Sequence, residues 1–175
     1  MLSEKQLHLL SLCQIEGLNW HMLARQAQRP GGLELLLKGE PTEISGDLGE
    51  IKATLRSGIK RRAELQADVT RRIAPAENIG ARITTVLDDD YPLNLRRIFN
   101  LPPFLFYIGE LRPDDVKAVA VVGTRNPSRE GLTRGRKLAS LLAREGVTVL
   151  SGLAAYPTES DQRFRSKLTS DSPVI

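Results

Sequence analysis

Residues 119–152 constrain the fold of this chain most, because strand and helix patterns alternate there over a short distance. The apolar run 119–122 (VAVV) stops at Gly123, and a helical pattern then runs from about residue 129 to 144. A second apolar run, 147–150 (VTVL), follows and ends in Ser-Gly. Strand, loop, helix and strand within this length are typical of one βαβ unit, so the sequence predicts an α/β protein.

The loops after the two predicted strands are where an open α/β sheet binds its ligands. Gly123 lets the backbone turn sharply and lets a phosphate approach without a Cβ clash. Thr124 offers a hydroxyl and an amide, and Arg125 offers a planar guanidinium that matches phosphate oxygens or stacks on a base. Ser128 can cap the following helix, whose free amides add positive potential. We therefore expect an anion-binding site formed by Gly123, Thr124, Arg125, Asn126, Ser128, Ser151 and Gly152.

A second interpretation of the first loop stays open at this point. Arg125 can pair with a local carboxylate while Gly123 only serves the turn, and short glycine motifs often match by chance. Arg96, Arg97 and Arg129 are weaker candidates for ligand contact, because surface arginines are usually solvated.

The charge distribution favours a polyanionic partner. The whole chain has 175 residues, a net charge of +4 and a sequence pI of about 9.5. Between Arg112 and Gly152, eight basic residues and four acidic residues give 8 − 4 = +4, which equals the excess of the whole chain. A basic segment of this kind attracts polyanions.

Other functional classes find little support in the composition. Cys13 is the single cysteine and reads as a small buried residue of a helix, so neither a disulfide nor a Cys/His metal site is expected. No apolar run approaches membrane-spanning length and no signal peptide is apparent, which predicts a cytoplasmic protein without membrane contact. We expect no catalytic residue, no metal and no cofactor.

Residues 1–75 show helical periodicity and predict a small all-helical domain. Ser3 and Asn19 are expected N-caps, and the segment 46–72 is expected to hold a fourth and a fifth helical element. The turn at 15–18 (IEGL) resembles the turn of a SAM or helix-hairpin-helix domain, which can hold a phosphate on backbone amides. A plain interhelical turn is the alternative. Pro75 and Gly80 are expected to mark the change of domain.

From residue 81 the pattern becomes strand-like. The run 83–87 (ITTVL) predicts a strand, 94–99 a short helix, and 104–108 (FLFYI) a second strand. Asp88, Asp89 and Asp90 lie between them. A turn is favoured over a metal site here, because no further carboxylate or histidine follows at ligand spacing.

Several motifs in this order resemble the DNA-processing protein A family (DprA/Smf). They are the patterns DYPxxL at 90–95, LPPxLFxxG at 101–109, VVGTR at 121–125 and GVxVxSGLA at 146–154. The resemblance covers residues 1 to about 154. It implies an incomplete Rossmann-like DNA-binding domain over residues 81–154, with Gly123, Thr124 and Arg125 lining the DNA pocket.

The resemblance also implies a role and partners. Proteins of this family bind single-stranded DNA, protect it during natural transformation and help to load it onto RecA. They act in DNA recombination as homodimers and are not classified as enzymes. The family's downstream DNA-contacting lysine, its dimerisation surface and its RecA-contacting surface lie beyond Ala154, so none of them transfers to this chain.

The resemblance stops abruptly after Ala154. Residues 155–175 are polar, rich in Ser and Thr, and without periodicity, so we expect a disordered tail, as a frameshift or truncation would produce. Under this interpretation the strand 119–122 has at least one unpaired side, and stability is marginal.

Three functions remain open from the sequence. The first is a single-stranded DNA-binding module of the DprA type. The second is a nucleotide-binding hydrolase or transferase, although both histidines, His8 and His21, lie in the helical region and away from the loops. The third is a nonfunctional truncated fragment.

Overall fold

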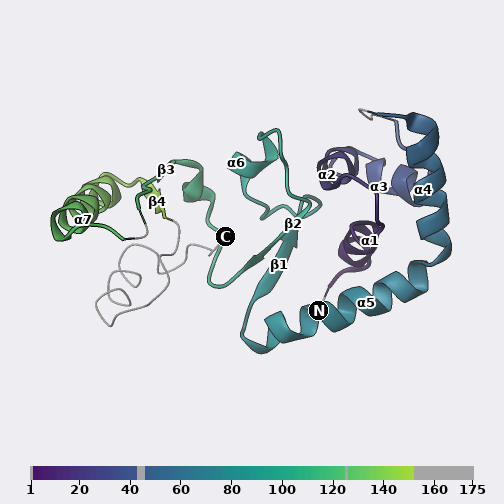
Figure 1. Cartoon of the computed structure of the whole chain (residues 1–175), viewed down its shortest axis with the longest axis horizontal. Coiled ribbons are helices and arrows are strands. Elements are labelled where there is room, and N and C mark those ends of the chain that lie inside the picture. The colour runs from purple at the N-terminus through teal and green to yellow at the C-terminus, as the bar shows by residue number, and fades with distance from the viewer. Residues whose placement is uncertain (1, 43–45, 125, 152–175) are drawn as a thin grey trace. The chain divides into compact units, whose positions relative to one another are not determined.

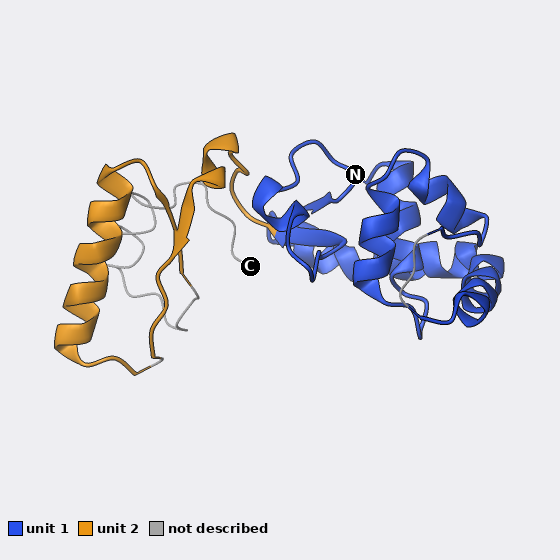
Figure 2. Ribbon diagram, turned by 90° about the horizontal axis from the view of Figure 1, so that it is seen from above, with its two compact units in different colours: residues 1–106 blue, residues 107–175 orange. Residues whose placement is uncertain are grey.

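The computed structural model describes residues 2–42, 46–124 and 126–151. The predicted tail therefore lies outside the described residues, as do Arg125 and Gly152. The described residues are a mixture of helices and small sheets, which agrees with the expected α/β class. They form two compact units, residues 1–106 (unit 1) and residues 107–175 (unit 2), coloured blue and orange in Figure 2.

Unit 1 begins with three short helices, α1 (Glu4–Leu12), α2 (Trp20–Ala27) and α3 (Gly32–Leu37). The expected caps are confirmed. The Ser3 hydroxyl accepts from the Gln6 amide in a reciprocal capping box, and the Asn19 side chain accepts from the amides of His21 and Met22. Both caps are short polar side chains directly before an apolar periodic segment, so local chemistry sets where these helices start.

Two longer helices, α4 (Leu48–Lys60) and α5 (Arg62–Asn78), follow in an arc around the first three (Figure 1). The prediction that Pro75 marks the change of domain is wrong, because Pro75 lies inside α5. The helix continues past it since Val69 and Ile73 are buried against Leu10 of α1. This packing compensates for the backbone hydrogen bond that the proline cannot donate. The chain turns only at Gly80, which has a left-handed backbone with φ of 76°.

The first strand pair packs with the helices. β1 (Arg82–Thr85) pairs with β2 (Phe104–Tyr107), and the short α6 (Leu93–Arg96) lies between them in the sequence. Val86, Tyr91 and Leu101 are buried in the same hydrophobic cluster as Leu9 and Leu23. The division between units therefore falls at residues 106 and 107, whereas the sequence analysis expected a change of domain between residues 75 and 81.

Unit 2 contains the predicted βαβ segment. A short 3₁₀ helix, η1 (Pro113–Val116), leads into β3 (Ala118–Ala120), followed by α7 (Arg129–Arg144) and β4 (Thr148–Leu150). β3 and β4 are parallel, with Ala118 opposite Thr148 and Ala120 opposite Leu150. Among the described residues β3 pairs with β4 alone, and the two strand pairs form separate sheets. The single Rossmann-like arrangement over residues 81–154 stays a prediction.

Candidate nucleic-acid interface

The carboxyl ends of β3 and β4 lie next to each other. The two strands are in register up to Ala120 and Leu150, and the amide of Val121 donates to the carbonyl of Leu150 at 2.8 Å. Because the strands are parallel, the loops that follow them start at the same edge of the pair. Helix α7 packs beside β4 and connects the two strands (Figure 2). The geometry therefore brings together the starts of the two loops that were predicted to form one site.

The loop after β3 is exposed from Val122 to Thr124, and Val122 retains 83% of its accessible surface. The Thr124 hydroxyl accepts a hydrogen bond from the Asn126 amide at 3.3 Å, so this side chain bridges position 125. A threonine hydroxyl that accepts one hydrogen bond can still donate its own proton. Thr124 can thus donate to an anion while its oxygen holds the turn.

The backbone at Gly123 lacks the special conformation that a sharp turn requiring glycine would have. Gly123 is not among the glycines with positive φ, and a Cβ built at this position would meet nothing within 4 Å. The turn therefore does not require glycine for its own conformation. The approach of a phosphate to the backbone at Gly123 stays a prediction.

The amino end of α7 points out of this loop. Ser128 is the N-cap, and its Oγ accepts from the Gly131 amide at 3.1 Å. The amides of Arg129 and Glu130 begin the helix and have no carbonyl to bond to within it. With the helix dipole they provide positive potential at this end. Ser151 is exposed at the end of β4, so four of the predicted residues, Thr124, Asn126, Ser128 and Ser151, present polar groups to solvent.

Helix α7 carries five of the basic residues described in unit 2. The exposed basic side chains of this helix are Arg129, Arg134, Arg136, Lys137 and Arg144. Glu130 is the one acidic residue within the helix, and it forms an ion pair with Arg134 at 2.5 Å. The balance along the helix is 5 − 1 = +4. This i,i+4 pair was visible in the sequence but was not recognised there; it partly neutralises the only carboxylate of the first turn.

Two other carboxylates described in unit 2, those of Asp114 and Asp115, lie away from the loop edge. Asp115 accepts from the Thr148 hydroxyl at 2.9 Å, at the amino end of β4. Asp114 pairs with Arg112 at 3.5 Å in the segment that precedes β3. Both residues therefore lie at the end of the strand pair opposite the two loops. An acid–base enzyme would need such a group at the loops, and of Asp114, Asp115 and Glu130 it is the ion-paired Glu130 that lies close to them.

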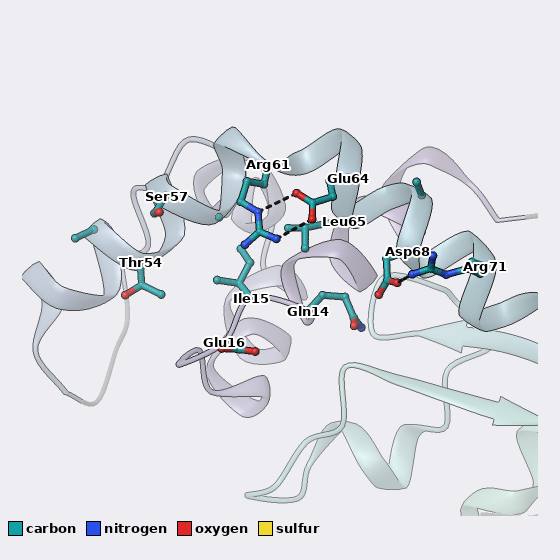
Figure 3. Close-up of a pocket in the computed structure, with 13 residues that line it drawn as sticks. Gln14, Ile15, Glu16, Thr54, Ser57, Arg61, Glu64, Leu65, Asp68 and Arg71 are labelled. Carbon is teal, nitrogen blue, oxygen red and sulfur yellow. Dashed lines mark hydrogen bonds and ion pairs between the residues drawn. The ribbon is translucent and has the colours of Figure 1, made fainter.

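The turn at residues 15–18 borders a groove of about 910 Å³ in unit 1. Figure 3 shows Ile15 and Glu16 on one side of the groove and Arg61, Glu64, Asp68 and Arg71 of the α4–α5 arc on the other. Gly58 lets this turn approach α4, since a Cβ there would come within 2.4 Å of Ile15 Cδ1.

Four charged side chains of this groove form two ion pairs, Arg61 with Glu64 and Arg71 with Asp68. Arg61 donates to both carboxylate oxygens of Glu64, at 2.8 and 2.9 Å. Hydrogen bonds from Arg71 and then Arg72 hold the pKa of Asp68 below its usual value. Counting Glu16, the lining has three carboxylates and two guanidinium groups, or 2 − 3 = −1. A groove with this balance does not favour a phosphate, so the structure favours a plain interhelical turn over a phosphate-binding hairpin.

The three adjacent aspartates stabilise a turn. The Asp88 carboxylate accepts from the Thr85 amide at 2.7 Å and from Gln6 Nε2 at 2.7 Å. Asp90 accepts from the Thr84 hydroxyl at 2.7 Å. Two of these side chains thus hold the segment between β1 and α6, the first in contact with α1. In the described parts of the chain no group of three or more His, Cys, Asp or Glu side chains is arranged to hold a metal ion.

Two further expectations concern Cys13 and the membrane. Cys13 is buried at the end of α1, and burial raises the pKa of its thiol to about 12, which makes it a poor nucleophile. None of the helices that the structure describes is long and apolar enough to cross a bilayer.

Comparisons with known proteins agree with the order of motifs. Residues 82–155 match the model of a family described as DNA recombination-mediator protein A. Protein Smf of Synechocystis sp. (strain PCC 6803) is 30% identical over 159 residues, which are 89% of this chain and 39% of the relative. The DNA processing protein DprA of Streptococcus pneumoniae is 40% identical over 70 residues, which are 40% of this chain and 24% of that protein. No solved structure matches.

The match has limited extent. The chain spans about two fifths of the length of the Synechocystis relative and about a quarter of the length of the Streptococcus relative. The matched segment runs through β1, β2, β3, α7 and β4, and so includes the loop edge of unit 2. Through residues 82–155, the chain belongs to the DprA/Smf family of DNA recombination-mediator proteins.

Proposed function

We propose that this chain binds single-stranded DNA at the loop edge of unit 2, in DNA uptake and recombination. The observation that carries the proposal is the hydrogen bond between Val121 and Leu150, because it fixes the starts of both loops side by side. Phosphate oxygens would accept from the Thr124 and Ser151 hydroxyls and from the first amides of α7. Membership of the DprA/Smf family supports DNA as the ligand. The hydroxyls and helix amides at the loop edge are hydrogen-bond donors of the kind that phosphate oxygens accept from.

The electrostatics favour the sugar–phosphate backbone over base edges. The residues at this edge are short hydroxyl side chains, backbone amides and arginines, which suit phosphate contacts that carry no sequence information. Binding should therefore weaken steeply with salt and show little sequence preference. RecA contact and dimerisation, which the family resemblance assigns to positions beyond Ala154, stay outside this proposal.

The test is a fluorescence-anisotropy titration of a labelled single-stranded oligonucleotide at several salt concentrations. Arg129→Ala is compared with Arg144→Ala, since both remove one exposed arginine from the same helix, at opposite ends. We expect Arg129→Ala to weaken binding by about 1 kcal/mol and to reduce the salt slope by about one, while Arg144→Ala changes little. Equal effects of the two variants would mean that only the net charge of α7 matters.

Arg125→Ala complements this pair, although residue 125 lies outside the described residues. By its place in the sequence between Thr124 and Asn126, we expect its loss to weaken binding by about 1–3 kcal/mol. Circular dichroism of each variant shows whether α7 is intact. Unchanged binding by a folded Arg125→Ala variant would contradict the assignment of the loop.

A further inference from the structure

Phe99 is an aromatic side chain that unit 1 leaves outside its core. The residue retains 82% of its accessible surface, while nearby Leu95 and Leu101 contribute to the hydrophobic core. Burying a phenylalanine side chain stabilises a fold by roughly 1.5–3 kcal/mol, and Phe99 does not contribute this. Ile98 and Phe99 are flanked in the sequence by two polar residues, Arg97 and Asn100, and both of these are exposed.

Hydrogen bonds from helix α2 hold the backbone at Phe99. Arg25 of α2 donates from Nη2 to the carbonyl of Phe99 at 3.1 Å and to the carbonyl of Ile98 at 3.4 Å. Its neighbours Met22, Leu23, Ala24, Gln26 and Ala27 are all buried, so the helix that carries Arg25 is fixed by packing. An exposed loop held at two carbonyls is preorganised for contact and loses little entropy when it binds.

The same arginine also covers the ring. The guanidinium carbon of Arg25 lies 5.5 Å from the ring centroid of Phe99, within the range of a cation–π contact. Arg97 follows α6 directly and is exposed, and it has no ion-pair partner among the described residues. The result is one open aromatic surface with a cation against it and a second cation two residues before it in the chain.

We propose that Phe99, supported by Arg25 and accompanied by Arg97, is a stacking platform for a base of single-stranded nucleic acid. The inference rests on the proposed function, and it adds a second contact, in unit 1, with a different chemistry. Every base offers a π-face, and a chain of bases alternates with phosphates, which the two arginines match. A protein partner fits less well, because the exposed polar residues Arg97 and Asn100 flank Ile98 and Phe99 in the sequence.

The experiment compares oligothymidylate with an abasic oligonucleotide of equal length, which keeps the phosphates and lacks the bases. Both are titrated into the full chain and into the Phe99→Ala, Phe99→Leu and Phe99→Trp variants. We expect Phe99→Ala and Phe99→Leu to bind oligothymidylate about tenfold more weakly, in the range of one stacking contact. Their affinity for the abasic strand should be unchanged, and Phe99→Trp should restore or exceed the original affinity for oligothymidylate.

Ile79→Ala is the matched control, since Ile79 is an apolar residue of unit 1 that is 70% exposed. Loss of affinity in this variant would mean that apolar area in general, and not the ring, drives binding, and would overturn the inference. An equal loss for both oligonucleotides in Phe99→Ala would overturn it too.

The two proposals fail in different ways. If the unmodified chain binds oligothymidylate in a salt-dependent manner and Phe99→Ala binds equally well, the platform is wrong and the proposed function stands. If the folded, unmodified chain binds neither oligonucleotide, the proposed function fails and the platform fails with it.

Discussion

The two units differ in how completely they bury their apolar residues. In unit 1 the buried residues run from Leu9 to Leu101 and join five helices and the first strand pair in two clusters. In the described part of unit 2 the buried side chains include Ala139 of α7 and Val149 of β4, but the exposed ones include Leu132, Leu138 and Leu141 of α7. One unit thus has a packed core, while the other leaves much of its amphipathic helix in contact with solvent.

This difference separates where stability arises from where the proposed DNA contacts lie. Most helical stability in proteins comes from packing of an apolar face, so α1 to α5 are stabilised by one another. In unit 2 the strand hydrogen bonds and the Ser128 cap have less packing to support them. The loop edge is therefore built on the unit that we expect to open more easily.

The largest expected effect compares one leucine from each unit. Leu55 of α4 is fully buried, whereas Leu138 of α7 is 50% exposed. Leu55→Ala should lower the free energy of unfolding of unit 1 by about 2–5 kcal/mol, because it leaves a cavity. Leu138→Ala should cost under about 1 kcal/mol.

Urea unfolding followed by tryptophan fluorescence measures the first of these changes. Trp20 is the only tryptophan and its ring lies 5.3 Å from that of Phe104, so its emission reports unit 1. Far-ultraviolet circular dichroism follows α7 in addition. A cost for Leu138→Ala as large as that for Leu55→Ala would show that the apolar face of α7 is covered in solution and would break the comparison.

The next effect is a loss of stability of unit 1 at alkaline pH. Burial raises the pKa of Cys13 from 9.0 to about 12 and that of Tyr91 from 10.0 to about 12. Both groups are neutral when protonated, and the folded state holds the proton more tightly. Their stabilising contribution is therefore complete below about pH 9 and is lost as the pH rises towards about 12.

Unfolding midpoints of unit 1 measured by Trp20 emission on both sides of pH 9 check this dependence. In the Cys13→Ala variant we expect a weaker decline, because one of the two groups is gone. A thiol reagent should label Cys13 only when unit 1 opens, since the side chain is 5% exposed. Labelling at the rate of a free thiol in native buffer would contradict its burial.

The smallest expected effect compares two serine caps. Ser3 caps α1 in unit 1, and Ser128 caps α7 in unit 2, each accepting from a backbone amide three residues on, at 3.2 and 3.1 Å. Each change to alanine should cost about 1 kcal/mol. If the units unfold independently, Ser3→Ala shifts the fluorescence transition alone and Ser128→Ala shifts a separate dichroism transition. A single transition that both variants shift equally would show that the units unfold together.

Local signals in the sequence predicted much of the secondary structure. The helix expected at about residues 129–144 is α7 with these bounds, and the caps at Ser3 and Asn19 form as expected, because each depends on residues within one turn. Pro75 was misleading for the opposite reason. Whether a helix survives a proline depends on tertiary partners, here Leu10 of α1, which lies far away in the sequence.

The candidate site was predicted in outline. A parallel βαβ unit brings the starts of its two loops together whatever its side chains are, so the pairing of the loops after β3 and β4 followed from the pattern. The conformation of Gly123 and the ion pair of Glu130 needed coordinates. The support of Phe99 by Arg25 could not be read from the sequence, because the two residues are 74 positions apart.

The hydrogen bond between Gln6 and Asp88 joins residues 82 positions apart, and Leu9 shares a hydrophobic cluster with Leu101. During synthesis the first helix therefore leaves the ribosome long before the residues that complete its surroundings. Leu9 and Leu10 complete their packing only after α5 and the segment around Leu101 have followed. Apolar surface that stays exposed in this way makes the nascent chain prone to aggregation until unit 1 is complete.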